Sequence, residues 1–406
     1  MSFRFPARWE GRDQGPNPLT EALAEARAKG RDVLDLTISN PTAVGLRFPD
    51  DWTGLLVEDQ SLRRYAPDPK GLPSARDAIA GYYADRGESV AREDLLLTAG
   101  TSEAYSHLFK LLCEPGEGIL VPRPSYPLLE TLADLAGLAI ASYPLVAREK
   151  GYATAWDIDR EGLVALITPR TRAIIAVQPN NPTGSVLSPD DGRWLLDLAG
   201  KRGLALIVDE VFADFRHDGG ASTPMLRPSG EAGPLVFTLN GLSKLLGLPQ
   251  LKLAWIHVAG NPSDKARAMD LLEWIGDAHL SVGTAPQLAC PELLRRRLEF
   301  QEPIRARLRE NLDALRKISA AFQTIERARL LPLWPQGGWC VPVRCAGLRR
   351  DEDDEAFAIR LVEEHGVLVQ PGYFFDFEDE ETIVISLLPE PAIFREGLTR
   401  LARALG

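Results

Sequence analysis

Cysteine, histidine and long apolar runs are all scarce in this sequence. Four cysteines and five histidines occur in 406 residues. Of the cysteines only Cys340 and Cys345 are close together, and no histidine stands at metal-ligand spacing from them. Four cysteines in a chain of this length do not make a disulfide scaffold. We therefore expect free thiols and no metal site.

No apolar run approaches the roughly 20 residues that a membrane-spanning helix needs, and the N-terminus lacks the apolar stretch of a signal peptide. Basic side chains are also in the minority, with 46 lysines and arginines against 57 aspartates and glutamates, a net charge of −11. This balance argues against nucleic acid or an anionic membrane as a partner. The sequence predicts a cytoplasmic protein that binds neither nucleic acid nor membrane.

What the chain does have is enough apolar sequence for two or three domains, with 45% apolar and 25% charged residues. Through its middle part, short apolar runs alternate with longer segments of helical spacing. Runs bounded by glycine or proline are typical of strands buried on both faces, and they occur at residues 95–97, 118–121, 173–177, 204–209, 234–239 and 253–258. The helical segments between them include residues 102–112, 126–135 and 190–199. This alternation predicts an α/β fold, with a large domain whose mostly parallel sheet is covered by helices.

The pattern changes after residue 283. Residues 290–322 have helical spacing interrupted by Pro291 and Pro303. Farther on, strands are predicted at 338–344 and 382–387 and helices at 355–364 and 394–405. We expect a smaller α+β domain here, onto which a helix at 19–28 and a strand at 33–37 dock. The expected division is an N-terminal segment at 1–50, a large domain at 51–283 and a small C-terminal domain at 284–406.

Four polar features follow the predicted strands, at the edge where open parallel sheets bind ligands. Glycine and hydroxyl residues at 98–103 would cradle a phosphate, and would equally well cap a helix. An Asn-Pro loop at 179–184 would equally well be a simple turn. Asp209 leaves an apolar strand, where a carboxylate needs a partner. Lys244 follows another strand, where a partly desolvated amine can act as a nucleophile or form a Schiff base.

These features belong to six short motifs that occur in order along the chain. They are Tyr65-Ala66-Pro67-Asp68 with Gly71, Gly100-Thr101-Ser102, Pro124-Ser125-Tyr126-Pro127, Asn181-Pro182-Thr183-Gly184, Asp209-Glu210, and Ser243-Lys244 with Gly247. Together they resemble the aspartate-aminotransferase-type (fold type I, class I/II) pyridoxal-phosphate-dependent aminotransferases, over residues 35–389. Pyridoxal 5′-phosphate needs a phosphate cradle, an anion at its ring nitrogen, a donor at its phenolic oxygen and a lysine at its aldehyde. The resemblance implies that these motifs supply them.

The resemblance also assigns roles to single residues. Lys244 and Asp209 would be catalytic: Lys244 would form an aldimine with the cofactor and then move the substrate proton, and Asp209 would pair with the ring nitrogen. The other cofactor-binding positions would be Asn181 at the phenolic oxygen, Tyr126 on the ring face, Phe212 beside it, and Gly100, Thr101, Ser102 and Lys252 at the phosphate. Tyr65 would reach the phosphate of a neighbouring subunit, which implies a homodimer with its sites at the subunit interface.

Three positions of the cofactor site depart from the family pattern. Phe212 stands where the family usually has a tyrosine that donates to the phenolic oxygen. Lys252 stands where it has an arginine, and lysine keeps the charge but loses the bidentate fork. Gly241 stands where a serine is frequent.

A fourth departure concerns the substrate. In amino-acid transaminases a strand near the C-terminus carries an arginine that binds the substrate α-carboxylate, and Val384 stands at that place here. No arginine lies between Gln370 and Leu388. Valine cannot replace a bidentate arginine–carboxylate pair. Arg47, on a loop that borders the pocket in this family, is a candidate substitute, although it would equally well be a solvated surface arginine.

The resemblance thus implies an aminotransferase that exchanges an amino group between an amino acid and a 2-oxo acid. An alternative keeps the cofactor but changes the reaction to that of a lyase, decarboxylase or cyclase acting on an amino acid or amine, because the missing clamp frees the orientation of the α-carbon. A third interpretation is a cofactor-holding regulatory protein without catalysis. Lys244 and Asp209 are intact, and no DNA-binding segment is appended.

Overall fold

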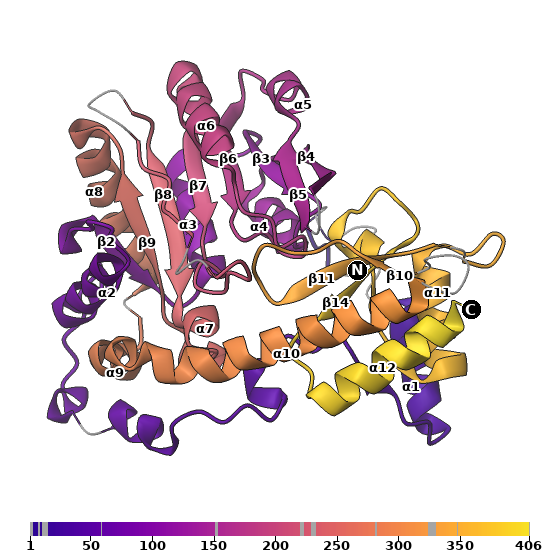
Figure 1. Cartoon of the computed structure of the whole chain (residues 1–406). Helices are drawn as coiled ribbons and strands as arrows, with labels where there is room; N and C mark the ends of the chain where they lie inside the picture. The colour runs from indigo at the N-terminus through magenta and orange to yellow at the C-terminus, as the bar shows by residue number, and fades with distance from the viewer. Residues whose placement is uncertain are drawn as a thin grey trace.

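A computed structural model describes residues 3–6, 9, 15–57, 59–150, 153–219, 223–228, 233–280, 282–323, 330–346 and 348–405. Its main feature is an eight-stranded sheet with the order β2-β9-β8-β7-β6-β3-β4-β5 (Figure 1). The strands are β2 (Leu95–Thr98), β3 (Gly118–Arg123), β4 (Ala139–Lys150), β5 (Ala153–Ile158), β6 (Thr171–Val177), β7 (Ala205–Asp209), β8 (Val236–Gly241) and β9 (Ala254–Ala259).

The centre of this sheet is parallel, from β8 through β7, β6 and β3 to β4, whereas β9 and β5 run antiparallel to their neighbours. Its apolar residues are buried on both faces because helices cover each side. One face is covered by α3 (Thr101–Leu112), α4 (Leu128–Ala136) and α8 (Pro262–His279), and the other by α5 (Arg160–Ala165) and α6 (Pro189–Arg202). The large mostly parallel sheet covered by helices is therefore confirmed.

A second sheet of four strands has the order β10-β11-β14-β13. It consists of β10 (Leu330–Pro332), β11 (Cys340–Cys345), β13 (Gln370–Pro371) and β14 (Thr382–Ser386). The helices α10 (Arg297–Gln323), α11 (Asp354–Arg360) and α12 (Pro391–Ala404) share its hydrophobic core. The smaller α+β unit is thus also present. In Figure 1, α10 extends from the large part of the molecule to the small part.

The N-terminal segment joins the small sheet's part of the molecule, as expected. Helix α1 (Pro18–Ala28) packs against α11, and β1 (Leu34–Asp35) pairs in parallel with β12 (Val367–Leu368). Three 3₁₀ helices, Pro41–Ala43, Asp50–Leu56 and Gln60–Arg63, lead from there to α2 (Pro73–Asp85) on the large sheet. The division of the chain at residues 50 and 283 stays a proposal, which limited proteolysis would test.

The structure corrects one expectation and adds one element. Pro291 and Pro303 do not interrupt their segment: they lie inside α9 (Thr284–Arg295) and α10, and the helices change at Arg296. A proline removes one backbone hydrogen bond, and α10 continues because Ile304 and Leu308 are anchored in the core. The hairpin of β4 and β5 was missed, because Ser142, Pro144 and the charged residues from Arg148 onward interrupt its apolar residues.

Candidate active site

The loops that follow β2, β3, β6, β7 and β8 end at one edge of the large sheet and surround a cavity of about 320 Å³. The small sheet closes the cavity from the other side. Its described lining consists of Thr37, Ser39, Thr101, Tyr105, Ser125, Tyr126, Leu128, Leu129, Val177, Asn181, Asp209, Val211, Phe212, Lys244, Trp339, Cys340, Gln370 and Phe375. The structure therefore brings six of the predicted site residues to one cavity: Thr101, Tyr126, Asn181, Asp209, Phe212 and Lys244.

Lys244 lies in the short helix α7 (Leu242–Leu245), directly after β8. Its Nζ is 5.0 Å from the centre of the Trp339 ring and 5.6 Å from that of Phe212. Burial lowers the pKa of this amine, against the attraction of the Cys340 sulfur and the Asp209 carboxylate, which raise it. A buried lysine with a lowered pKa has a larger fraction of free amine at neutral pH, as a nucleophile requires.

The structure explains why glycine occupies position 241, just before this helix. A Cβ on Gly241 would lie 2.7 Å from the Cβ of Ala254 on the neighbouring strand β9. Serine there would push β8 and β9 apart. The glycine therefore permits the close approach of the two strands immediately before Lys244.

Asp209 is the last residue of β7, and its carboxylate has two donors. Tyr105 on α3 donates its hydroxyl to Oδ2 over 3.1 Å, and the backbone N–H of Val211 donates to Oδ1 over 3.1 Å. Burial raises the pKa of Asp209 to about 6, while these hydrogen bonds and the charge of Lys244 lower it. The carboxyl is therefore mostly ionised at neutral pH, although its side chain is buried.

Glu210, the next residue, does not line the cavity. Its Oε1 accepts a hydrogen bond from Gln178 over 3.1 Å, and its Oε2 is 3.7 Å from a nitrogen of Arg86. Burial raises its pKa to about 8. The two adjacent acids therefore lie in different places: Asp209 lines the cavity, and Glu210 lies behind it.

The Asn-Pro loop holds its two asparagines differently. Asn180 is buried and donates to the carbonyl of Pro124 over 2.9 Å and to the hydroxyl of Thr183 over 3.0 Å. This ties the loop to the turn that carries Tyr126. Asn181 is left to line the cavity with its amide.

The expected phosphate cradle lies at the N-terminus of α3. A Cβ on Gly100 would lie 3.4 Å from the Nζ of Lys252, so the lysine amine reaches this helix end. Lys252 has a φ of 51°, in the left-handed region that side chains other than glycine rarely adopt. Thr101 lines the cavity, whereas Ser102 is exposed on the first turn of the helix. A helix N-terminus together with a lysine amine suits an anion.

Besides Gly100, Ser102 and Lys252 at the helix end, two further predicted residues lie outside the cavity lining. Tyr65 is 75% exposed, and Arg47 is exposed as well. Neither belongs to the described cavity lining. Arg47 therefore does not take the place of the missing arginine within this chain.

The structure adds a wall that the sequence did not reveal. Trp339 lines the cavity and also packs edge-on against Phe212, with ring centres 5.2 Å apart. Cys340, Gln370 and Phe375 come from the small sheet and its loops. Only tertiary structure brings them to the cavity. The sequence does contain an indication for Tyr105, since it lies four residues after Thr101 and therefore on the same face of the predicted helix.

The donor set fits pyridoxal 5′-phosphate. An amine, a carboxylate and an amide line one cavity with aromatic rings, and a lysine reaches a helix N-terminus beside it. These are the groups that such a cofactor needs at its aldehyde, ring nitrogen, phenolic oxygen, ring face and phosphate. Among the described residues, no cluster of histidine, cysteine or carboxylate side chains is arranged to hold a metal ion.

Comparison with known proteins identifies the class. The family described as aminotransferase class I and II matches residues 31–402, and the chain belongs to this family. The mouse (Mus musculus) tyrosine aminotransferase is 26% identical over 397 residues, covering 94% of this chain and 85% of that protein. Glutamate-pyruvate aminotransferase AlaA of Escherichia coli K12 is 30% identical over 275 residues, covering 67% of this chain and 66% of that protein.

The fold agrees with solved structures of the same class. An alanine aminotransferase from Pyrococcus furiosus superimposes with a TM-score of 0.86 at 23% identity, covering 99% of each chain. An Escherichia coli aminotransferase gives a TM-score of 0.84 at 24% identity, covering 100% of this chain and 98% of that one. The chain is therefore a transferase of amino groups, in a family that generally depends on pyridoxal phosphate.

Proposed function

We propose that the cavity around Lys244 is the site at which the chain moves an amino group from an amino compound to an oxo compound. The observation that carries this proposal is the partly desolvated Lys244 amine in the same cavity as the buried Asp209 carboxylate. Pyridoxal phosphate, when bound, supplies an electron sink for the carbon that carries the amino group. Amino acids and 2-oxo acids are the pair that the family implies.

Lys244 would hold the cofactor at its aldehyde and give way to the substrate amine. The freed Lys244 amine would then accept the proton of the substrate carbon and return a proton. Its lowered pKa suits this exchange, because a general base works best with a pKa near the operating pH. Asp209 would face the ring nitrogen as a carboxylate, supported by the hydroxyl of Tyr105.

The remaining residues position the cofactor. Asn181 would donate to the phenolic oxygen, and Tyr126 would lie on the ring face. Gly100, Thr101, Ser102 and Lys252, at the N-terminus of α3, would hold the phosphate. Phe212 bounds the ring without donating a hydrogen bond, because phenylalanine lacks the hydroxyl of tyrosine.

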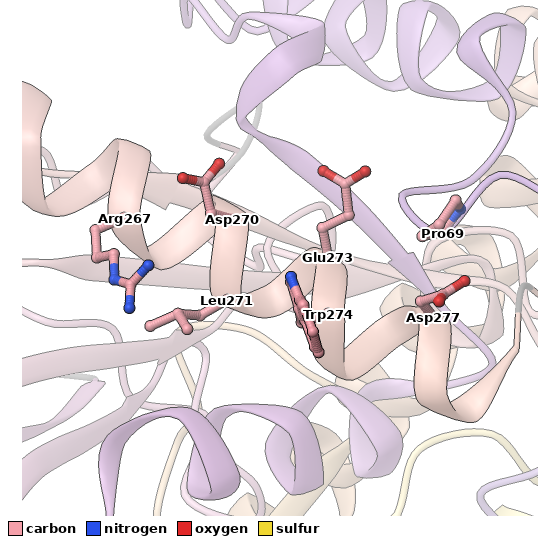
Figure 2. A pocket seen from close by; sticks show the side chains of 7 residues that line it. All are labelled: Pro69, Arg267, Asp270, Leu271, Glu273, Trp274 and Asp277. Carbon is pink, nitrogen blue, oxygen red and sulfur yellow. The ribbon is translucent and has the colours of Figure 1, made fainter.

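We also propose that a homodimer is the functional unit. Trp274 on α8 is 81% exposed, and it borders a surface pocket with Arg267, Asp270, Leu271, Glu273, Asp277 and Pro69 (Figure 2). Lys70 pairs with Glu273 over 3.1 Å and so holds the segment after Tyr65 against this helix. A second copy that covers this face would bury Trp274 and bring Tyr65 to the neighbouring cavity.

Analytical ultracentrifugation tests the homodimer. The unmodified protein should sediment with twice the mass of the chain. Trp274→Glu should weaken the association, whereas Trp194→Glu, on α6 at the opposite face of the sheet, is the matched control. A monomeric unmodified protein would contradict the proposal.

The activity is tested with the purified holoenzyme and a panel of amino compounds. A donor should convert the cofactor absorbance to that of the amine form, and an oxo compound should restore it. Release of carbon dioxide or of an eliminated group without this cycle would point to the decarboxylase or lyase alternative. A panel without any spectral change would contradict the proposal.

The cytoplasmic location stays a proposal as well. The four cysteines are free, three of them buried, which suits a reducing compartment. Among the described residues, no helix is long and apolar enough to cross a membrane. Fractionation of cells that express the protein would test the location.

A further inference from the structure

The wall of the cavity opposite the large sheet has no charge. In the small sheet, Val384 on β14 pairs with Pro342 on β11 and with Gln370 on β13. Residues paired in this way point to the same face, and Gln370 lines the cavity. Val384 is fully buried on that face in an apolar cluster with Trp156, Leu333, Cys340, Phe375 and Phe377. Apolar side chains thus fill the place where a carboxylate clamp would stand.

No guanidinium reaches the cavity from the described lining. The charged residues there are Lys244 and Asp209, one of each sign. Arg123, close in sequence to Tyr126, is engaged elsewhere: its Nε donates to the carbonyl of Asp376 over 3.1 Å, and a terminal nitrogen lies 3.4 Å from Glu378. Residues 370–388 contain five acidic side chains and no basic one.

A substrate carboxylate against this wall would be poorly stabilised. It would lose its hydration without gaining a cation from the described lining of this chain, and an unpaired buried charge is strongly disfavoured. The Lys244 amine cannot pair with this carboxylate, because it would hold the cofactor aldehyde and then carry the proton of the substrate carbon. Asp209, the one carboxylate in the described lining, would add repulsion. Gln370, by contrast, offers a donor and an acceptor to a neutral hydroxyl.

We propose that both substrates present an uncharged group to this wall: the donor is a primary amine or amino alcohol, and the acceptor is an aldehyde or ketone. This inference rests on the proposed function and specifies its substrate class. The donor's C–N bond breaks and a C=O bond forms at the same carbon, which loses two electrons. The amino group and the two electrons would pass to the aldehyde carbon of the cofactor. The donor would displace the Lys244 amine from that carbon without releasing water, and one water would be consumed when the oxo product leaves. The acceptor would reverse every step and release one water.

Matched donors test the inference on the unmodified holoenzyme. The half-reaction is followed by absorbance with L-phenylalaninol against L-phenylalanine and with L-alaninol against L-alanine. The alcohol should have the higher kcat/KM in both series. A ratio of one or less overturns the inference while leaving the proposed function intact, and the absence of reaction with all four donors overturns the function instead.

A cation introduced at the wall should reverse the preference. Gln370→Arg places a guanidinium on the cavity face, and Gln370→Met is the matched neutral control. The ratio of alcohol to acid should fall about tenfold to a hundredfold in Gln370→Arg, as a charge-assisted pair with the carboxylate forms. Val384→Arg should act alike if it folds, and Gln370→Arg decides the matter if it does not. An unchanged ratio in Gln370→Arg overturns the inference.

Binding without turnover gives an independent readout. Titration calorimetry of the holoenzyme compares 3-phenylpropan-1-ol with 3-phenylpropanoate, neither of which has an amino group. The unmodified protein should bind the alcohol more tightly, and Gln370→Arg should bind the acid more tightly. Tighter binding of the acid by the unmodified protein contradicts an uncharged substrate group, whatever the activity shows.

Discussion

The two walls of the cavity differ in chemistry and in how their residues are placed. The wall on the large sheet carries the amine of Lys244, the carboxylate of Asp209 and the amide of Asn181, each at or just after the end of a buried strand. The wall on the small sheet is neutral and mostly apolar, with Trp339, Cys340, Gln370 and Phe375.

This difference separates the reaction from the choice of substrate. The first wall provides what a carbonyl cofactor needs for any amino-group transfer. The second wall meets the part of the substrate that does not react, and its lack of charge selects what that part can be. Substitutions in the first wall should therefore abolish or slow every reaction, whereas those in the second should change the preference among substrates.

The largest effect is expected at Lys244. Lys244→Ala removes both the attachment of the cofactor and the group that moves the proton. Turnover should fall at least about a thousandfold with every donor. The half-reaction measured by absorbance tests this, with the exposed Lys110→Ala as control. Turnover within tenfold of the unmodified enzyme would show that Lys244 is not the catalytic amine.

Asp209 should follow in size of effect. Asp209→Asn removes the anion at the ring nitrogen and should lower kcat about a hundredfold, in the range found when one preorganised electrostatic contact is lost. Glu210→Gln is the matched control, because Glu210 lies behind the wall with a pKa of about 8 and is largely neutral at pH 7. An equal loss in both variants would show a structural rather than an electrostatic role.

Tyr105 should change the pH dependence more than the rate. Its hydroxyl donates to the Asp209 carboxylate and lowers the pKa of that group, so Tyr105→Phe should raise it. The loss of activity on the acid side should then begin at a higher pH, by about 0.4–1 unit for one hydrogen bond. A pH profile of kcat/KM measures this shift. A shift to lower pH would contradict the assigned support of Asp209.

Phe212 should tune the cofactor without abolishing the reaction. The natural phenylalanine gives no hydrogen bond to the phenolic oxygen, so the bound cofactor should hold its proton to a higher pH than in Phe212→Tyr. A spectrophotometric pH titration of the bound cofactor should show a lower midpoint in the variant. The same midpoint in both proteins would show that residue 212 does not face the phenolic oxygen.

The smallest effect is expected at Cys340, on the neutral wall. Its thiol lies 3.9 Å from the hydroxyl of Ser39, and burial raises its pKa to about 11, so it is not a thiolate at neutral pH. Cys340→Ala should keep kcat within about threefold and lower the free energy of unfolding by about 1 kcal/mol. Activity assays and urea unfolding test both values. A hundredfold loss of kcat would place reactive chemistry on this wall.

The two walls also differ in how far the sequence could predict them. Asp209 and Lys244 follow continuous apolar runs, and strands of that kind end at a common edge of a parallel sheet. Their meeting in one cavity could therefore be expected from local pattern. The hairpin of β4 and β5 has only the short apolar run 138–141 before Ser142 and Pro144 interrupt it, and it was missed for that reason.

The neutral wall has no local signature. Gln370 stands in a two-residue strand, and Cys340 pairs with Ser386 of β14, more than 40 residues away in sequence. Their position at the cavity depends on how the small sheet docks onto the large one. The absence of an arginine near Val384 could be read directly from the sequence, but the apolar cluster that takes its place needed the structure.

The most direct test of the account is to locate the cofactor on the chain. The holoenzyme is reduced with borohydride, digested and mapped by mass spectrometry. One reduced pyridoxal phosphate adduct per chain should be found, on the peptide that contains Lys244. An adduct on Lys252 or another lysine, or none at all, would contradict the assignment of the active site.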